Sequence, residues 1–278
     1  MSPQAENQQE QTFSNPVQSV FIIRHGDRWD YQHPEWKKTA ARKGDPSLST
    51  LGHEQARQVG RYLDNLFVEE GISADQITLL SSPFLRTIQT ANELLAEIKK
   101  TRGNPGNTVK IKPEYSVFEF DLWGQDFHSS LPQMDERKCY FPRLDEHYET
   151  AFVPELPEDC QKFFNRCDEA MKHISDDYPC DEEGKNRVII IVTHAACCIG
   201  LAKSATGMAL QEINAAAPCS IFKMTRKSSD SAWRMDHYAK DGGLNGFTDH
   251  MENIGTNTRP WNNFGDKNVN NGWTGPPN

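Results

Sequence analysis

The 278-residue chain is 36% hydrophobic, which is enough to form the core of one large α/β domain or of two small domains. Its net charge of −9 argues against general nucleic-acid binding, because phosphate-backbone affinity requires clustered Lys and Arg. No run approaches the roughly 18 apolar residues of a membrane span. We therefore expect neither a nucleic acid nor a membrane as a partner.

The N-terminal residues, MSPQAENQQEQTFSNP, are polar and lack the apolar core of a signal peptide. The seven cysteines form no CxxC pair and fit free thiols in a reducing compartment. We expect a cytoplasmic protein with a disordered segment at 1–16, one domain at 17–264 and a flexible tail at 265–278.

The stretch VFIIRHGDR begins with a β-branched apolar run at 20–23, which predicts a buried strand. The run stops at Arg24, His25 and Gly26, and Arg28 follows closely. Ligands of open α/β sheets bind at this end of a strand, and glycine allows a sharp turn or close approach there. The pattern favours an anion site containing a titratable nitrogen; the alternative is a strand that ends in a solvated basic turn.

An irregular stretch at 27–47 follows, and its length at the end of a strand is typical of a functional loop. Residues 48–71 then show helical spacing of apolar residues. Thr50 is the expected N-cap of this helix, and Gly71 is expected at or just after its end.

A second short strand is expected at 77–80, and a polar turn with Pro83 leads from it into a helix that reaches Ile98. Arg86 lies in the first turn of that helix. Residues 101–108 form a predicted Gly, Pro and Asn turn, and a third strand is expected at 109–112.

Residues 121–157 show no clear periodicity and are interpreted as an irregular insertion that could cover a site. A helix is expected from Pro157 to about Asp177. The residues predicted to share its buried face are Cys160, Phe164, Cys167, Met171 and Ile174.

A second apolar, β-branched strand at 187–194 ends in His194, as the first strand ends in His25. It should be central in the sheet, and a helix at 195–206 closed by Gly207 should follow. A terminal strand pair is expected at 219–225 and 232–238. Beyond residue 241 we expect a loop, with Trp261 and Phe264 docked on the domain.

The alternation of strands and helices predicts a three-layer α/β/α sandwich with a mostly parallel central sheet. Four segments across 17–238 occur in the order and spacing of one known family. The chain resembles the histidine phosphatase superfamily, with a phosphoglycerate mutase-like fold, in RHG at 24–26, LSTLGHEQA at 48–56, SSPFLRTIQTA at 81–91 and VTHA at 192–195.

Within that superfamily the chain is most similar to the suppressor-of-T-cell-receptor-signalling proteins and the ecdysteroid-phosphate phosphatases. This resemblance lies in RHGDR with Arg28, in VFEF around Glu119 and in HMENIGTNTRPWNNF at 250–264. Those proteins carry ubiquitin-associated and SH3 domains, for which this chain has no room, so a stand-alone catalytic domain is expected.

The resemblance implies that His25 is a nucleophile that forms a phosphohistidine and that His194 completes the phosphate pocket. Arg24 and Arg86 supply planar, permanently charged groups suited to holding phosphate oxygens. Arg28 is expected to add a further contact to the substrate phosphate, beside Gly26. No metal or other cofactor is expected.

The leaving alcohol needs a proton, and Glu119 is where the resembled branch keeps its acid. Three neighbouring acidic residues remain alternatives: Glu114, Asp121 and Asp126. Aromatic residues could form a wall for a bulky leaving group, although aromatics in loops pack on the core at least as often. These aromatic candidates are Trp29, Tyr31, Trp36, Phe120 and Trp123.

The leading hypothesis is a metal-independent phosphatase acting on a phosphorylated small molecule or a phosphoprotein, with phosphotyrosine-like and steroid phosphates as candidates. A phosphoglycerate-type mutase is disfavoured, because 121–155 is dominated by Asp, Glu and aromatic residues rather than by Lys and Arg. A weakly active or inactive scaffold protein with the phosphatase fold is the other alternative. The sequence leaves a homodimer open.

Overall fold

A computed structural model describes residues 18–102, 109–121, 134–179, 187–213, 215–228, 231–236 and 248. Its centre is a six-stranded sheet in the order β3-β2-β4-β1-β5-β6. The strands are β1 (Gln18–Arg24), β2 (Ile77–Ser81), β3 (Ile111–Pro113), β4 (Arg187–Thr193), β5 (Ile221–Arg226) and β6 (Arg234–Met235).

The sheet is parallel from β3 to β1 and antiparallel at β5 and β6. As predicted, β4 is central, since it pairs with β1 on one side and β2 on the other. Every residue of β1 is buried, which fits the continuous apolar run of a strand covered on both faces.

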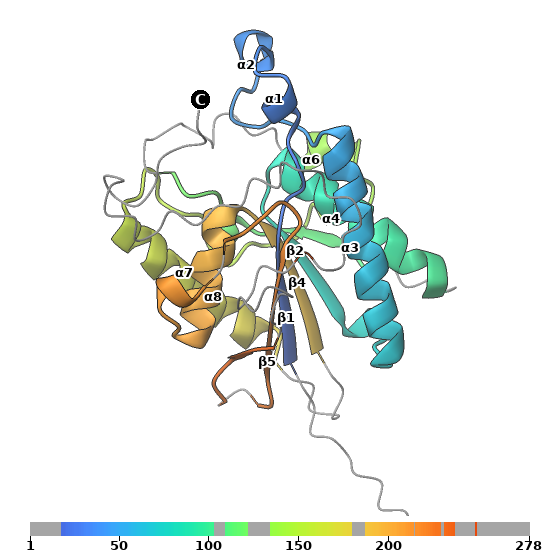
Figure 1. Cartoon of the computed structure of the whole chain (residues 1–278), viewed down its shortest axis with the longest axis vertical. Coiled ribbons are helices and arrows are strands. Elements are labelled where there is room, and N and C mark those ends of the chain that lie inside the picture. The colour runs from blue at the N-terminus through green and yellow to red at the C-terminus, as the bar shows by residue number, and fades with distance from the viewer. Residues whose placement is uncertain are drawn as a thin grey trace, which may run out of the picture.

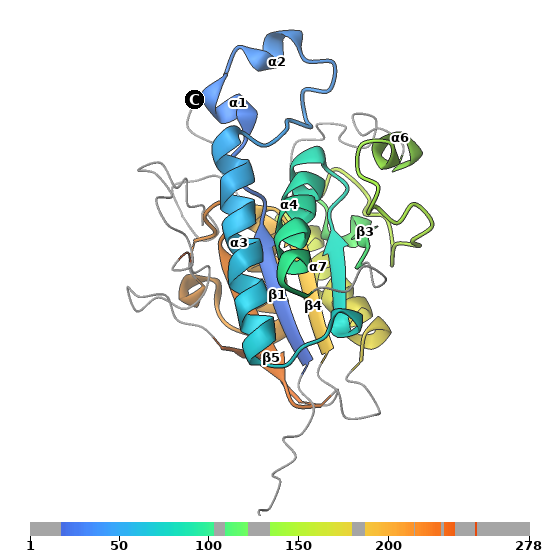
Figure 2. The same ribbon diagram turned by 90° about the vertical axis from the view of Figure 1, so that its right-hand side faces the viewer.

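Helices cover both faces of the sheet, as Figures 1 and 2 show. One layer contains α3 (Thr50–Glu69) and α4 (Leu85–Arg102), and the other contains α7 (Cys160–Asp177) and α8 (Ala195–Thr206). The predicted three-layer α/β/α sandwich is confirmed. Shorter helical elements are α1 (Trp29–Gln32), α2 (Trp36–Thr39), η1 (Ala74–Gln76), η2 (Tyr115–Val117), α6 (Met134–Lys138) and η3 (Leu210–Glu212).

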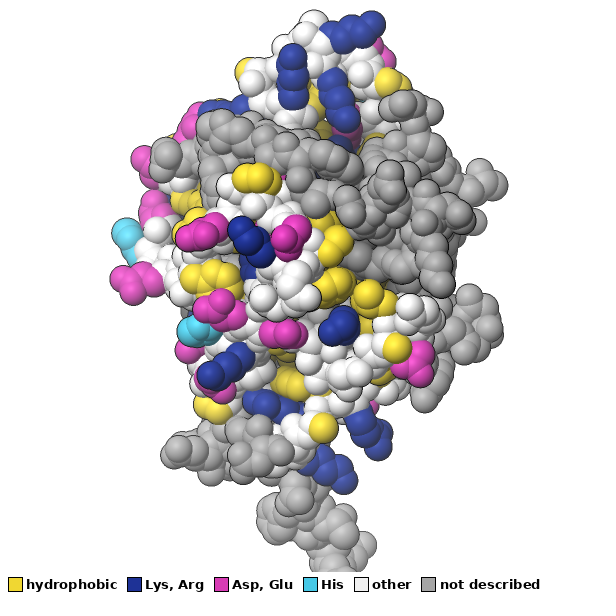
Figure 3. Space-filling model, turned by 90° about the vertical axis from the view of Figure 1, so that its left-hand side faces the viewer, with side chains coloured by type: hydrophobic (Ala, Val, Ile, Leu, Met, Phe, Trp, Pro, Cys, Tyr) yellow, Lys and Arg dark blue, Asp and Glu magenta, His cyan; other side chains and the backbone are white. Residues whose placement is uncertain are grey.

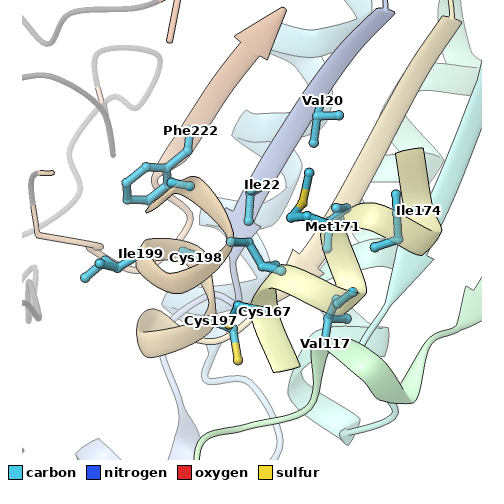
Figure 4. Packing of buried hydrophobic residues seen from close by; sticks show 14 of the residues in the cluster. Val20, Ile22, Val117, Cys167, Met171, Ile174, Cys197, Cys198, Ile199 and Phe222 are labelled. Atoms are coloured by element: carbon cyan, nitrogen blue, oxygen red, sulfur yellow. The ribbon is translucent and has the colours of Figure 1, made fainter. Parts of the chain in front are cut away.

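The apolar side chains of β1 alternate between two cores, because successive residues of a strand point to opposite faces. Val20 and Ile22 pack in the cluster under α7 and α8, whereas Phe21 and Ile23 pack under α3 and α4. Figure 4 shows Val20 and Ile22 on the α7/α8 side, near Met171. Burying each such side chain stabilises the fold by about 1.5–3 kcal/mol.

Two predicted helix starts were wrong, and side-chain capping explains both. Ser49, not Thr50, is the N-cap of α3, since its hydroxyl accepts a hydrogen bond from the Gly52 N–H at 3.1 Å. The helix expected from Pro157 begins at Cys160, because Asp159 accepts a hydrogen bond from the Lys162 N–H at 2.8 Å.

The buried face of α7 differs from the predicted row of residues. Cys167, Met171 and Ile174 are buried as expected, but Cys160 and Phe164 are only partly buried. Phe163 and Ala170, which were not in the predicted row, are fully buried. The stripe is therefore wider than the predicted row.

The stretches expected to be irregular contain short helices: α1 and α2 lie within 27–47, and α6 lies within 121–157. The third strand starts at Ile111 rather than at residue 109, and α4 continues to Arg102, into the predicted turn. In the predicted terminal pair, the strands are shorter, Ile221–Arg226 and Arg234–Met235.

The predicted N-terminal segment at 1–16, the tail at 265–278 and the docking of Trp261 and Phe264 lie outside the described residues. Among the helices that are described, none combines the length and the apolar character needed to cross a bilayer. On the face seen in Figure 3, acidic side chains lie mainly across the middle of the described surface, and Lys and Arg side chains lie both among them and near its two ends.

Candidate active site

The register of the sheet brings the two predicted histidines together. Arg24, the last residue of β1, pairs with Thr193, the last residue of β4, so His25 and His194 follow on neighbouring strands. The His25 N–H donates to the Thr193 carbonyl at 2.9 Å. Both side chains are buried, and their ring centroids are 5.5 Å apart at an interplanar angle of 65°.

The next strand along the sheet, β2, supplies an arginine and a hydroxyl. Ser82 directly follows β2, and its Oγ lies 2.9 Å from His194 Nε2. Four residues later, Arg86 in the first turn of α4 has a guanidinium nitrogen 3.2 Å from His194 Nδ1. The guanidinium also stacks on the Phe84 ring, 4.2 Å from its centroid. The strand end and the helix start therefore deliver both groups to one histidine.

Glu119 reaches the same cluster from the segment after η2. Its Oε2 lies 3.2 Å from His194 Nδ1 and 3.4 Å from an Arg86 nitrogen, and its Oε1 accepts a hydrogen bond from the Phe120 N–H. The side chain is 22% exposed, so it is open enough to exchange protons with a bound molecule.

The alternatives to Glu119 are placed differently where they are described. The buried carboxylate of Glu114 accepts hydrogen bonds from the Ser116 and Ala151 N–H groups, from the Tyr148 hydroxyl and from Thr150. It therefore anchors its own loop. Asp121 is fully buried, and Asp126 lies outside the described residues.

In the sequence, Arg24 precedes the His25–Gly26 pair and Arg28 follows it. Arg24 is buried and donates to the Ala216 carbonyl at 2.7 Å. Arg28 is held in a bidentate pair with buried Asp30, with Nε to Oδ1 at 2.9 Å and a second nitrogen to Oδ2 at 2.8 Å. Its guanidinium also lies over the Tyr31 ring, 4.5 Å from the centroid.

Gly26 is needed because two backbones approach closely here. A Cβ on Gly26 would lie 2.5 Å from the Gly52 carbonyl oxygen at the start of α3. The Gly26 N–H donates to Thr90 Oγ1 of α4 at 3.1 Å. The two helices α3 and α4 therefore fix the turn that carries His25.

The electrostatics of the site favour a neutral His25. Burial, and then the positive charges of Arg86 and Arg24, lower the pKa of His25 well below its usual 6.5. Its Nδ1 lies 2.8 Å from the Gly26 carbonyl oxygen, which can only accept a hydrogen bond. Nδ1 therefore carries the proton, and the lone pair of the neutral ring is on Nε2.

The neighbouring groups have shifted pKa values as well. Burial lowers the pKa of His194 to about 4 against the opposing effect of Glu119, and Arg86 lowers it further. Burial would raise the pKa of Glu119, but contact with His194 and the charges of Arg86 and Arg28 lower it to about 2. Burial and the charge of Arg28 lower the pKa of Arg86 to about 10. At neutral pH the cluster thus contains neutral histidines, a carboxylate and cationic arginines.

Sequence reasoning missed Ser82 and Asp30, although both are close to predicted residues in the chain. Of the two alternatives left open for the aromatic candidates, packing on the core holds for Phe120, which is buried against Phe163 with ring centroids 4.6 Å apart. Trp29 is 37% exposed and stacks on His33 at 3.9 Å, while Trp123 lies outside the described residues. No cluster of His, Cys, Asp and Glu suited to a metal ion occurs among the described residues.

The model of the histidine phosphatase superfamily (branch 1) matches residues 20–240. The chain belongs to this superfamily. The matched range contains both histidines, the arginines and Glu119, so the resemblance predicted from the sequence is confirmed at the level of the family.

Two curated relatives are the human and mouse ubiquitin-associated and SH3 domain-containing protein A. The human protein is 27% identical over 209 residues, covering 64% of this chain and 29% of the relative, and the mouse protein is 24% identical over 233 residues, covering 69% and 34%. The chain thus spans about a third of the length of these relatives, which belong to the branch expected from the sequence.

Two solved structures show the same fold. The ecdysone phosphate phosphatase from Bombix mori, in complex with tungstate, has a TM-score of 0.60 and 23% identity, covering 79% of this chain and 92% of that chain. A phosphoglycerate mutase from Bacillus anthracis has a TM-score of 0.51 and 15% identity, covering 86% and 96%. The predicted phosphoglycerate mutase-like fold is confirmed.

Proposed function

We propose that this protein is a metal-independent phosphatase that hydrolyses phosphate monoesters through a phosphohistidine at His25. The observation that carries the proposal is the neutral His25 ring, whose Nδ1 is held by the Gly26 carbonyl and whose surroundings are cationic. An imidazole in this state offers Nε2 as a nucleophile, and guanidinium groups attract the phosphate that it attacks.

Arg86 is suited to hold the phosphoryl oxygens. It is fully buried, and its Nε has no hydrogen-bond partner among the described residues. A phosphate oxygen would satisfy this N–H, because a buried donor without a partner costs about 1–3 kcal/mol. Arg24 and Arg28 add further positive charge near His25, so cationic side chains can neutralise the phosphate.

In the first step the Nε2 lone pair of His25 forms the N–P bond while the P–O bond to the leaving group breaks. Glu119, in its protonated form, gives its proton to the departing oxygen. In the second step water attacks phosphorus, the N–P bond breaks and its electrons return to Nε2. Glu119 then accepts the proton of the attacking water, which restores the acid for the next cycle.

Glu119 has to acquire a proton before it can act as an acid, because its pKa of about 2 leaves it ionised at neutral pH. A bound phosphate compensates the charges of Arg86 and Arg28 that hold this pKa down, so binding raises it. A substrate that binds as the monoanion also brings a proton with it, since the second pKa of a phosphate monoester is about 6.

For the substrate we propose a phosphate ester of a bulky apolar or aromatic alcohol, such as a steroid phosphate or a phosphotyrosine-like group. The Bombix mori protein with this fold is an ecdysone phosphate phosphatase, and Trp29 provides an exposed aromatic surface next to Arg28. A mutase reaction is less favoured, because the segment 121–155 is rich in acidic residues.

The test is a rate measurement on aryl phosphates, phosphotyrosine peptides, steroid phosphates and sugar phosphates, combined with rapid-quench trapping. We expect an acid-labile, base-stable phosphoenzyme in the wild type and in His173→Ala, a control on the exposed side of α7. His25→Ala should form none and lose turnover. An acid-stable adduct would contradict the role of His25.

Two further outcomes separate the competing functions. Interconversion of 2- and 3-phosphoglycerate would favour a mutase. Absence of turnover on the whole panel by a folded protein would favour a scaffold that uses the fold without its chemistry.

A further inference from the structure

A buried ion pair lies outside the cluster of histidines and arginines. Arg166 of α7 and Glu158, just before that helix, are 5% and 3% exposed. Arg166 Nε donates to Glu158 Oε2 at 2.9 Å, and a second guanidinium nitrogen contacts Oε1. Burying two charges is costly, so such a pair by itself is weak support for stability. Its other contacts indicate what it does.

The third guanidinium nitrogen of Arg166 holds the backbone that leads to Glu119. It donates to the Ser116 carbonyl at 2.9 Å and to the Phe118 carbonyl at 3.0 Å. One planar group therefore binds a carboxylate on one edge and two backbone oxygens on another. A lysine ammonium cannot reproduce that geometry.

Two more donors fix the same short backbone, which we call the acid-bearing segment (residues 116–119). The Val117 carbonyl accepts from Thr193 Oγ1 of β4 at 2.7 Å, and the Phe118 carbonyl also accepts from Cys197 Sγ of α8 at 2.7 Å. Figure 4 shows Val117 facing α7 in the apolar cluster. The segment is thus tied to β4, the strand that His194 directly follows.

Glu158 completes the arrangement on the far side of Glu119. Its backbone N–H donates to the Asp121 carbonyl at 3.0 Å. Arg166 therefore holds the chain at Phe118, one residue before Glu119, and the Glu158 backbone holds it at Asp121, two residues after Glu119. Between these two points the Glu119 carboxylate extends to His194 and Arg86.

We propose that Arg166, oriented by Glu158, is a positioning residue for Glu119: it fixes the acid-bearing segment so that the carboxyl group reaches the leaving-group oxygen. This inference rests on the proposed function of the site. Displacing a catalytic group by about 1 Å can cost about 10²-fold in rate. A purely structural pair would instead affect all substrates equally.

The test uses Arg166→Lys and a double variant, Glu158→Gln with Arg166→Gln, which leaves no unpaired buried charge. The control is Arg57→Gln with Glu93→Gln, which removes a half-buried ion pair between α3 and α4. Each protein is measured with phenyl phosphate and with 4-nitrophenyl phosphate, whose leaving group needs little help from an acid, and for inhibition by vanadate.

We expect kcat/KM for phenyl phosphate to fall about tenfold or more in both Arg166 variants, and for 4-nitrophenyl phosphate to fall less than about threefold. Vanadate inhibition should stay within about twofold of wild type, because the arginines of the site are untouched. In a Glu119→Gln background the Arg166 change should add no further loss. Equal losses on both substrates, or full additivity with Glu119→Gln, would overturn the proposal.

Amide hydrogen exchange gives a readout that does not need activity. In the double variant, the amides of residues 116–120 should exchange faster than in wild type, whereas the amides of β1 should exchange at the wild-type rate. In the control variant neither set of amides should change. If the wild type were inactive, the proposed phosphatase function would fail, yet unchanged exchange at 116–120 would still refute the role of Arg166. Faster exchange confined to those residues would support it.

Discussion

The imidazole rings of His25 and His194 lie edge to face, with their centroids 5.5 Å apart. Two imidazolium ions at this distance would repel each other inside the protein. Burial lowers the pKa of both, to about 4 for His194 and well below 6.5 for His25, and nearby arginines lower them further. The site thus combines two neutral histidines with permanently charged guanidinium groups, which suits attack on an anion.

The pH profile should reflect the neutral state of His25. Only neutral His25 can attack, so activity is lost as pH falls through its pKa, and the acid limb of kcat/KM should lie well below pH 6.5. Arg28→Gln removes one of the charges that lower this pKa, so the acid limb should move to higher pH. Arg42→Gln, an exposed control, should leave it in place. The profiles are compared with one substrate, and an unmoved limb in Arg28→Gln would contradict this account.

Arg86 should matter for binding oxyanions as well as for turnover. Arg86→Ala removes a buried cation beside His194, so vanadate or tungstate should inhibit at least about tenfold less strongly, since charge-assisted hydrogen bonds contribute about 1.5–3 kcal/mol. Arg61→Ala, on the exposed side of α3, is the control and should be inhibited as strongly as wild type. Inhibition constants give the answer, and unchanged inhibition in Arg86→Ala would remove this residue from the phosphate site.

Much of the fold follows from local pattern. The apolar runs at 20–23 and 188–192 are rich in β-branched residues and bounded by charged or polar residues, and both form buried strands. The choice of His25 and His194 also follows, because each directly follows such a strand. The two histidines lie close together because Arg24 pairs with Thr193. The register between strands that are far apart in the sequence cannot be predicted from either strand alone.

Other features depend on long-range contacts. The contact of Ser82 with His194 joins residues 112 positions apart, and that of Arg166 with Ser116 joins residues 50 apart. Glu119 was preferred to Glu114 on the family resemblance and not on the residues themselves. The two differ in the structure because the Glu114 carboxylate is used for backbone hydrogen bonds within its own loop. Helix starts were missed by one to three residues, because adjacent Ser, Thr and Asp compete as caps.

Two glycines should respond differently to substitution by alanine. In Gly26→Ala the new Cβ would meet the Gly52 carbonyl oxygen at 2.5 Å, so the backbone must shift and both stability and turnover should fall. In Gly207→Ala nothing lies within 4 Å, but φ is +69°, so we expect a stability loss of about 1–2 kcal/mol with kcat/KM retained. Thermal unfolding and kinetics separate the two, and normal activity in Gly26→Ala would refute the close-packing argument.

Glu119 is best tested through the leaving group. If its carboxyl protonates the departing oxygen, Glu119→Gln should lose about 10²-fold or more on phenyl phosphate and much less on 4-nitrophenyl phosphate. The comparison uses kcat/KM, which reports steps up to phosphoryl transfer to His25, whereas kcat also includes hydrolysis of the phosphohistidine. A lower kcat on both substrates would fit the second role of Glu119, as base for the attacking water. Glu169→Gln, an exposed carboxylate on α7, is the control and should behave as wild type. Equal losses in kcat/KM on both substrates would show that Glu119 is not the acid, and Asp121 and Asp126 would then be tested in the same way.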